Sequence, residues 1–189
     1  VLEVQYPSDH PQTLGISIIE PNAAGAAVLS GLDGGVDLFE EVVGDGQPSQ
    51  WSRHRILFWP KSKTPLVLIT NRREAEPALF GKIRVLEVQG PLPRAHPVGD
   101  PATARLVAAY LDRPLFPDNF SAHEVLVPPS QLGMHDWRTF YQGGTRLIEY
   151  LNHVGYGGLI LSVYADGSTI YPSRLLEPTT RYDTGEFLT

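Results

Sequence analysis

A twelve-residue segment at positions 90–101, GPLPRAHPVGDP, constrains the fold of this chain more than any other stretch. It contains four prolines and two glycines. Proline lacks a backbone N–H and fixes φ, so a run this dense does not fit the interior of a helix or of a sheet. Short apolar runs precede the segment and helical patterns follow it. We therefore expect a first domain at residues 1–89 and a proline-rich linker that begins at residue 90.

The first domain reads as a series of short strands. Strand-like runs rich in apolar and β-branched residues occur at residues 14–20 (LGISIIE), 55–59 (RILFW), 64–70 (TPLVLIT) and 80–88 (FGKIRVLEV). The chain also has 18 Gly and 17 Pro, spread without a period, which favours many tight turns. We expect an antiparallel β-sandwich, jelly-roll-like in topology, although a small barrel would give nearly the same pattern.

Two patterns after residue 90 indicate helices. In residues 100–113, Asp100 is a capping residue and the apolar positions lie on one helical face until Pro114. Residues 115–132 read as an irregular connection. A second helix is expected to begin after the capping Asp136 and to end at Gly155.

An apolar strand is expected directly after the second helix. Residues 159–165, LILSVYA, are apolar on both faces, as in a buried parallel strand, and Tyr164 is expected to be buried with them. The predicted organisation is therefore a helical connector at residues 90–135 and a helix–strand unit at residues 136–189. The fold class is α+β.

Composition excludes several classes of partner. The formal charge is -6, and no basic cluster is longer than Arg72-Arg73, so nucleic acid is not expected. There is no cysteine, the six histidines show no metal-binding spacing, and no phosphate loop or dinucleotide fingerprint occurs. We therefore expect no metal and no cofactor. No apolar run approaches the roughly 20 residues of a membrane span.

The loop after residue 165 contains the candidate binding residues. In (β/α)-type folds, loops at the carboxyl ends of the strands build the active site. Aromatic rings pack against the apolar faces of sugars while polar neighbours bind hydroxyls. The candidate substrate-binding residues are Asp166, Tyr171, Ser173 and Asp183. Each has a structural alternative, because Asp166 can lead a turn, Tyr171 can anchor the loop, Ser173 can cap a helix and Asp183 can orient a neighbour.

The end of the chain resembles a known family. The run YLNHVGYGGLILSVYADGSTIYPSRLLEP combines a helix, a Gly-containing turn, a strand and the Tyr171-Pro172-Ser173 loop. It is similar to the start of the barrel in the glycosyl hydrolase-like family ten proteins, over residues 136–185. The resemblance implies a (β/α)8 barrel that acts on glycosidic bonds in an exported or cell-envelope protein. It also implies a truncated barrel here, without the later strands that would supply the acid and base.

Glycoside hydrolysis needs two facing carboxylates. The acidic residues near the loop, Asp166, Glu177, Asp183 and Glu186, form no pair that can be assigned, so the catalytic residues stay unassigned and the chain alone is expected to be inactive.

Two hypotheses for function remain. One is the N-terminal portion of a glycoside hydrolase-like, carbohydrate-active protein whose partner is a polysaccharide or other glycan. The alternative is a non-catalytic β-sandwich module that binds carbohydrate or protein. Pairing of the strand at residues 159–165 within the first domain would favour the module, whereas a separate strand with open edges would favour the truncated barrel. The tryptophans Trp51 and Trp59 are expected to pack in the core or at a sheet edge.

Overall fold

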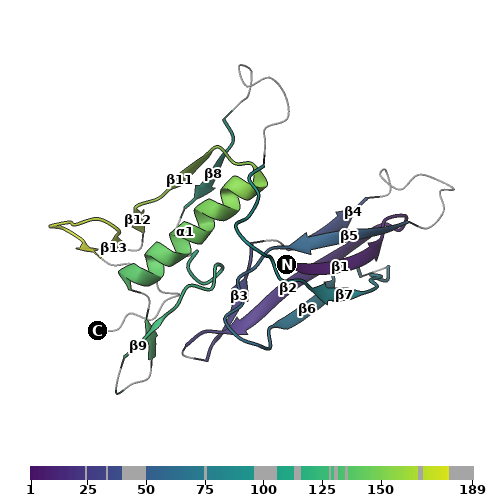
Figure 1. The fold of residues 1–189 in the computed structure, drawn as a ribbon, viewed down its shortest axis with the longest axis horizontal. Helices are drawn as coiled ribbons and strands as arrows, with labels where there is room; N and C mark the ends of the chain where they lie inside the picture. The colour runs from purple at the N-terminus through teal and green to yellow at the C-terminus, as the bar shows by residue number, and fades with distance from the viewer. Residues whose placement is uncertain are drawn as a thin grey trace. The chain divides into compact units, whose positions relative to one another are not determined.

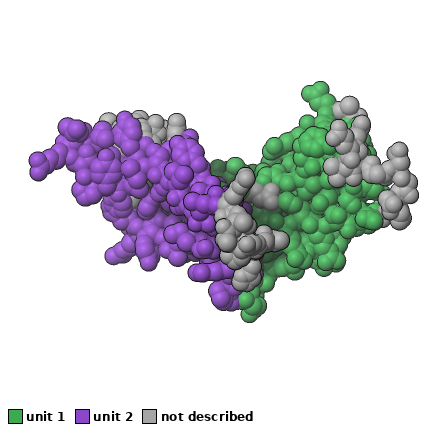
Figure 2. Space-filling view, turned by 90° about the horizontal axis from the view of Figure 1, so that it is seen from above, with its two compact units in different colours: residues 1–21, 27–89 green, residues 22–26, 90–189 purple. Residues whose placement is uncertain are grey.

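The computed structural model describes residues 1–23, 25–32, 34–39, 50–74, 76–95, 106–112, 116–127, 129, 132–134, 136–165 and 168–178. The chain divides into two compact units, Val1–Pro21 with Ala27–Gln89 and Asn22–Ala26 with Gly90–Thr189 (Figure 2). The described part is rich in strands, mostly antiparallel, and it contains one helix (Figure 1). Mixed α and β content with a predominance of antiparallel sheet is thus confirmed.

The first unit contains two antiparallel sheets. In one, β1 (Leu2–Pro7) lies between β5 (Trp51–Ile56) and β7 (Ile83–Val85). In the other, β2 (Gln12–Pro21) pairs along one edge with β6 (Leu66–Asn71). Along its opposite edge it pairs first with β4 (Gly35–Leu38) and then with β3 (Ala27–Ser30).

The two sheets share one hydrophobic core. Side chains alternate between the faces of a strand, so every second residue of β2 points to the same side. Leu14, Ile16 and Ile18 of β2 are buried there in a single cluster. The cluster also contains Leu2, Val4 and Ile56 of the other sheet and Phe58, which follows β5. This shared core is consistent with the expected β-sandwich.

Polar side chains close both ends of the buried stripe on β2. At its start, the Gln12 amide nitrogen donates to the Pro7 carbonyl (3.1 Å), and its amide oxygen accepts from the Leu79 N–H (2.7 Å). At its end, the Glu20 carboxylate is fully buried and accepts the backbone N–H groups of Lys61 (3.0 Å) and Ser62 (2.8 Å). The hydroxyls of Ser30 (3.0 Å) and Ser62 (2.9 Å) complete its shell. Burial raises the pKa of Glu20, but these hydrogen bonds outweigh it and lower the pKa below its usual value.

We expect Glu20→Gln to lower the free energy of unfolding by about 2 kcal/mol, because a buried charged acceptor of several hydrogen bonds is lost. The folded pKa of Glu20 lies below its ordinary value of 4.5. The ionised Glu20 therefore contributes fully to the free energy of unfolding above pH 4.5, and this contribution is lost as the pH falls through the folded pKa. Urea unfolding across this range tests both points. Glu74→Gln, in an exposed loop, is the matched control, and equal losses in the two variants at pH 7 would contradict the role of Glu20.

The second unit is built around α1 (Trp137–Val154), whose predicted ends are confirmed. The Asp136 side chain accepts the N–H groups of Arg138 and Thr139, both at 2.9 Å, and Gly155 ends the helix with φ of 90°. These hydrogen bonds, led by the Thr139 N–H, lower the pKa of Asp136. One face of α1 is buried at intervals of four residues, namely at Thr139, Gly143, Leu147 and Leu151.

This face of α1 packs against the segment that contains Phe116 and Phe120. The rings of Phe116 and Phe140 lie 5.3 Å apart, and those of Phe120 and Tyr150 lie 5.9 Å apart. A Cβ at Gly143 would lie only 3.0 Å from the Cα of Pro117, so the glycine allows a close approach at this crossing.

We predict that Gly143→Ala is less stable than Gly144→Ala by about 1–3 kcal/mol. Both substitutions gain the same helix propensity, but only the methyl at 143 meets backbone. At Gly144 the nearest atoms are in the Phe116 ring, 3.9 Å away, which is ordinary contact. Thermal unfolding of the two variants measures the difference, and equal stabilities would rule out tight packing at Gly143.

The strand expected after α1 is parallel as predicted, but its partner strand was not foreseen. β8 (Ala108–Leu111) pairs in parallel with β11 (Gly158–Leu161), and α1 lies between them in the chain. The helix predicted at residues 100–113 is therefore wrong over the strand β8, while its first residues fall outside the described part. Hydrogen bonding to β11, which is distant in sequence, overrode the local helical pattern.

The strand predicted at residues 159–165 is shorter and more exposed than expected. β11 ends at Leu161, and Ile160 is 58% exposed, so burial on both faces is wrong. A small sheet follows, in which β13 (Ser168–Thr169) pairs with both β12 (Tyr164–Ala165) and β14 (Glu177–Pro178). The connection predicted as irregular contains an antiparallel pair, β9 (Val125–Val127) and β10 (Leu132–Met134).

Candidate functional site

Two of the four predicted binding residues lie in the described loop after β11. Tyr171 is 45% exposed. The Ser173 hydroxyl accepts the N–H groups of Leu175 and Leu176, both at 3.1 Å. These bonds stabilise a turn, and no helix follows Ser173 among the described residues, so the expected helix cap is not found there. Asp166 and Asp183 fall outside the described residues. Of the two described candidates, the Tyr171 side chain is exposed, and the Ser173 hydroxyl is engaged in the turn.

A second exposed tyrosine accompanies Tyr171 at the carboxyl end of β11. Tyr164 is paired with Thr169 in the small sheet and is 53% exposed, so its expected burial is wrong. The Thr169 hydroxyl donates to the Tyr171 carbonyl (2.7 Å), and the Ser162 hydroxyl donates to the Tyr164 carbonyl (2.8 Å). These bonds fix the backbone beneath both rings. An exposed tyrosine ring can pack against an apolar ligand face.

A stronger constellation lies on the outer face of the β5-β1-β7 sheet. Glu3 of β1 is opposite Arg55 on one side and Arg84 on the other. Its carboxylate accepts the Nε–H of Arg55 (2.9 Å) and two N–H groups of Arg84, the Nε–H at 3.1 Å. Only 1% of Glu3 is exposed. The hydrogen bonds from Arg84 and then Arg55 lower its pKa, so the carboxylate stays ionised beneath the two guanidinium groups.

The neighbouring rows of this face add two further cations and a tryptophan. Gln5 is opposite Arg53, its N–H donates to the Lys82 carbonyl (3.0 Å), and Pro7 is opposite Trp51. Because side chains alternate along strands, the outer residues of β5 and those at the start of β7 share one surface. We call this surface the cationic face, and its members are Trp51, Arg53, Arg55, Lys82 and Arg84.

Trp51 is not in the core, but it lies on β5, an edge strand of its sheet, which was the other expected place. Its side chain is 57% exposed, and its six-membered ring lies against Gly81. A Cβ at Gly81 would lie 2.6 Å from Cζ3 of the indole, so only a glycine leaves room for the ring in this position. The motif-based prediction missed the cationic face. The sequence pattern that could have revealed it is a cationic or aromatic residue at every second position, as in Trp51-Ser52-Arg53-His54-Arg55 and again in Lys82-Ile83-Arg84.

We predict that Gly81→Ala displaces the Trp51 indole while leaving the fold intact, because the clash is with the far end of a side chain. The expected result is a shifted tryptophan emission spectrum with a change in the free energy of unfolding of less than about 0.5 kcal/mol. In a Trp51→Phe background the same substitution should leave the spectrum unchanged. A spectral change that persists in that background would assign it to another tryptophan.

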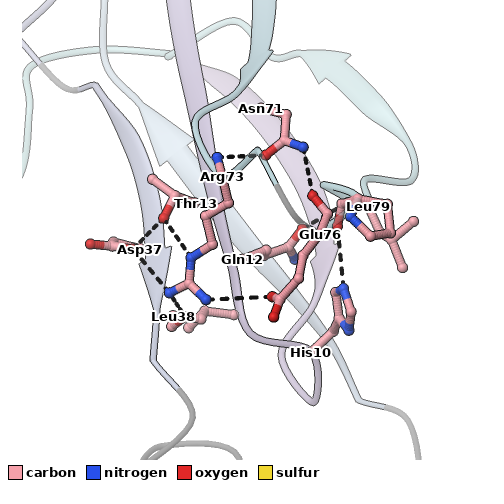
Figure 3. A network of polar contacts seen from close by, with 10 residues as sticks. His10, Gln12, Thr13, Asp37, Leu38, Asn71, Arg73, Glu76 and Leu79 are labelled. Atoms are coloured by element: carbon pink, nitrogen blue, oxygen red, sulfur yellow. Dashed lines mark hydrogen bonds and ion pairs between the residues drawn. The ribbon is translucent and has the colours of Figure 1, made fainter.

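A second polar network in the first unit has a structural role (Figure 3). The Arg73 guanidinium donates to the Thr13 hydroxyl (3.1 Å) and to the Leu38 carbonyl (2.9 Å). It also lies near two carboxylates, 3.5 Å from Glu76 and 3.9 Å from Asp37. The network joins the start of β2 to the end of β4 and to the loop after β6. The positive charge of Arg73 is thus paired within the network, and we interpret the network as a structural connection between these segments.

A shallow cavity of about 290 Å³ lies in the second unit. It lies between residues 91–94 and α1, where the Leu92 N–H donates to the Glu149 carboxylate (3.2 Å) and the His153 ring contacts the Pro93 carbonyl (2.8 Å). The size is at the lower limit of ligand pockets. The Glu149 carboxylate already accepts the Leu92 N–H and holds residues 91–94 in place, so we assign no ligand to this cavity.

Other site types were not found in the described part of the chain. No cluster of three or more His, Asp or Glu side chains there could hold a metal ion. No helix described has both the length and the apolar content needed to cross a membrane. Comparison of the chain with protein-family models, curated proteins and solved structures found no match.

Proposed function

We propose that this chain is the N-terminal portion of a glycoside hydrolase-like, carbohydrate-active protein, and that it binds glycan without cleaving it. The observation that carries the proposal is the β8–α1–β11 unit with the exposed Tyr164 and Tyr171 at the carboxyl end of β11. A parallel strand pair joined through a helix is the building unit of a (β/α)8 barrel, and binding loops follow the carboxyl ends of its strands. The family resemblance of residues 136–185 points the same way.

The β8–β11 sheet has unpaired edges among the described residues, which supports the barrel proposal. Among the described residues, β8 and β11 pair only with each other. Tyr110 and Ile160, which are opposite each other in the register, are 68% and 58% exposed. Parallel sheets are almost always larger and covered on both faces. We infer that further parallel strands complete this sheet and carry the two carboxylates that glycoside hydrolysis requires.

The alternative function is a non-catalytic β-sandwich that binds carbohydrate or protein. The exposed Trp51 on the outer face of β5 favours it, because an aromatic ring held at a fixed position on a sheet can pack against a sugar ring. The two functions are compatible, since one concerns the second unit and the other the first.

We expect Tyr171→Ala to weaken binding of the complete reading frame to its preferred polysaccharide by about tenfold, which is about 1.4 kcal/mol. Tyr141→Ala is the matched control, since Tyr141 is 77% exposed on α1, away from this loop in sequence. Binding is measured by affinity electrophoresis over a polysaccharide panel, and reducing ends are assayed in parallel.

The 189-residue chain should release no reducing ends, whereas the complete reading frame should. Cleavage by the 189-residue chain alone would contradict the missing acid and base. A complete reading frame without hydrolysis, and with binding unaffected by Tyr171→Ala, would reject the barrel proposal and leave the sandwich as the functional unit.

A further inference from the structure

We propose that the cationic face of the first unit binds an acidic polysaccharide. In this site, the indole of Trp51 packs against a sugar ring, and the cations of β5 and β7 bind its carboxylate or sulfate groups. The inference rests on the proposed function of the sandwich as a carbohydrate-binding module and adds the chemical class of the ligand.

The positive charge of the cationic face is the first reason to expect an anionic ligand. Four positive side chains lie on the same face as the Glu3 carboxylate, namely Arg53 and Arg55 of β5, Arg84 of β7 and Lys82 directly before β7. The chain as a whole has a formal charge of -6. On a chain of net negative charge, a polyanion is attracted to this local group of cations, which favours binding at one place.

Glu3 holds Arg55 and Arg84 in positions from which they can bind an anionic ligand. Each guanidinium has five N–H donors. The contacts with Glu3 use one donor of Arg55 and two of Arg84, so further donors of both groups can reach a ligand. Because the buried carboxylate already orders the two side chains, less conformational entropy is lost on binding. Arginine also matches the planar geometry of a carboxylate.

The spacing of the cations fits a repeating linear anion. Alternate residues of a strand lie about 7 Å apart, and strands separated by one neighbour lie about 10 Å apart. Trp51, Arg53 and Arg55 follow one another at alternate positions of β5. A chain of acidic sugars laid along β5 places one ring on the indole and successive charges beside the arginines. The Trp51 ring needs no rearrangement for this, since Gly81 already seats it.

The test compares polygalacturonate with its fully methyl-esterified form, which has the same backbone without the charges. We expect the protein to bind polygalacturonate in isothermal titration calorimetry at least tenfold more tightly than the ester. Affinity should fall steeply as NaCl rises from about 50 to about 300 mM, because salt screens exposed charges.

Two variants remove the contacts while keeping the Glu3 pairs intact. Trp51→Ala and the double variant Arg53→Ser with Lys82→Ser should each lower the affinity for polygalacturonate at least tenfold. Lys63→Ser with Arg72→Ser is the matched control, because it removes two exposed positive charges outside the cationic face. This control should stay within twofold of the parent, and thermal unfolding confirms that every variant is folded.

Three outcomes would overturn the inference. Equal, salt-independent binding of both polymers that is lost in Trp51→Ala would reject the acidic ligand but leave the sandwich as a carbohydrate-binding module. Binding of neither polymer, nor of other glycans, would reject the module as well. Tighter binding of a single-stranded oligonucleotide than of polygalacturonate would assign the cationic face to nucleic acid, which offers a base and phosphates to the same side chains.

Discussion

The buried stripe along β2 is the constraint on which the first unit depends. Its three apolar members contact the other sheet, and its polar ends, Gln12 and Glu20, are buried with them. A buried, ionised carboxylate is costly unless hydrogen bonds replace the water that it loses. The loop at Lys61-Ser62 and the hydroxyl of Ser30 meet that requirement, so the burial of one side chain fixes the positions of two other segments.

The strand β1 serves the core and the surface at the same time. Leu2 and Val4 on one side are buried in the core cluster, while Glu3 between them faces outward and is buried under two arginines. The pleat of the strand is responsible, because neighbouring residues must point to opposite faces. A centrally placed carboxylate lets two like charges lie close together on the sheet. Without it, Arg55 and Arg84 would repel each other across β1.

The packing of the second unit centres on the helix α1. Gly143 allows α1 to approach Pro117 closely, and the aromatic rings of Phe116 and Phe120 fill the contact. The strands before and after this helix pair in parallel. Their exposed apolar side chains distinguish this sheet from the closed core of the first unit. This contrast is one basis for our proposal that further strands complete the sheet of the second unit.

The sequence by itself determined the features that depend on neighbours in the chain. Asp136 and Gly155 fixed the ends of α1, because caps act on backbone groups only a few residues away. The strand-rich character before residue 90 followed from alternation and turns. Only the tertiary structure decided that residues 108–111 form a strand, that Trp51 is exposed, and that Arg53 and Lys82 share one face. Pairing and burial depend on partners distant in sequence, which local patterns do not specify.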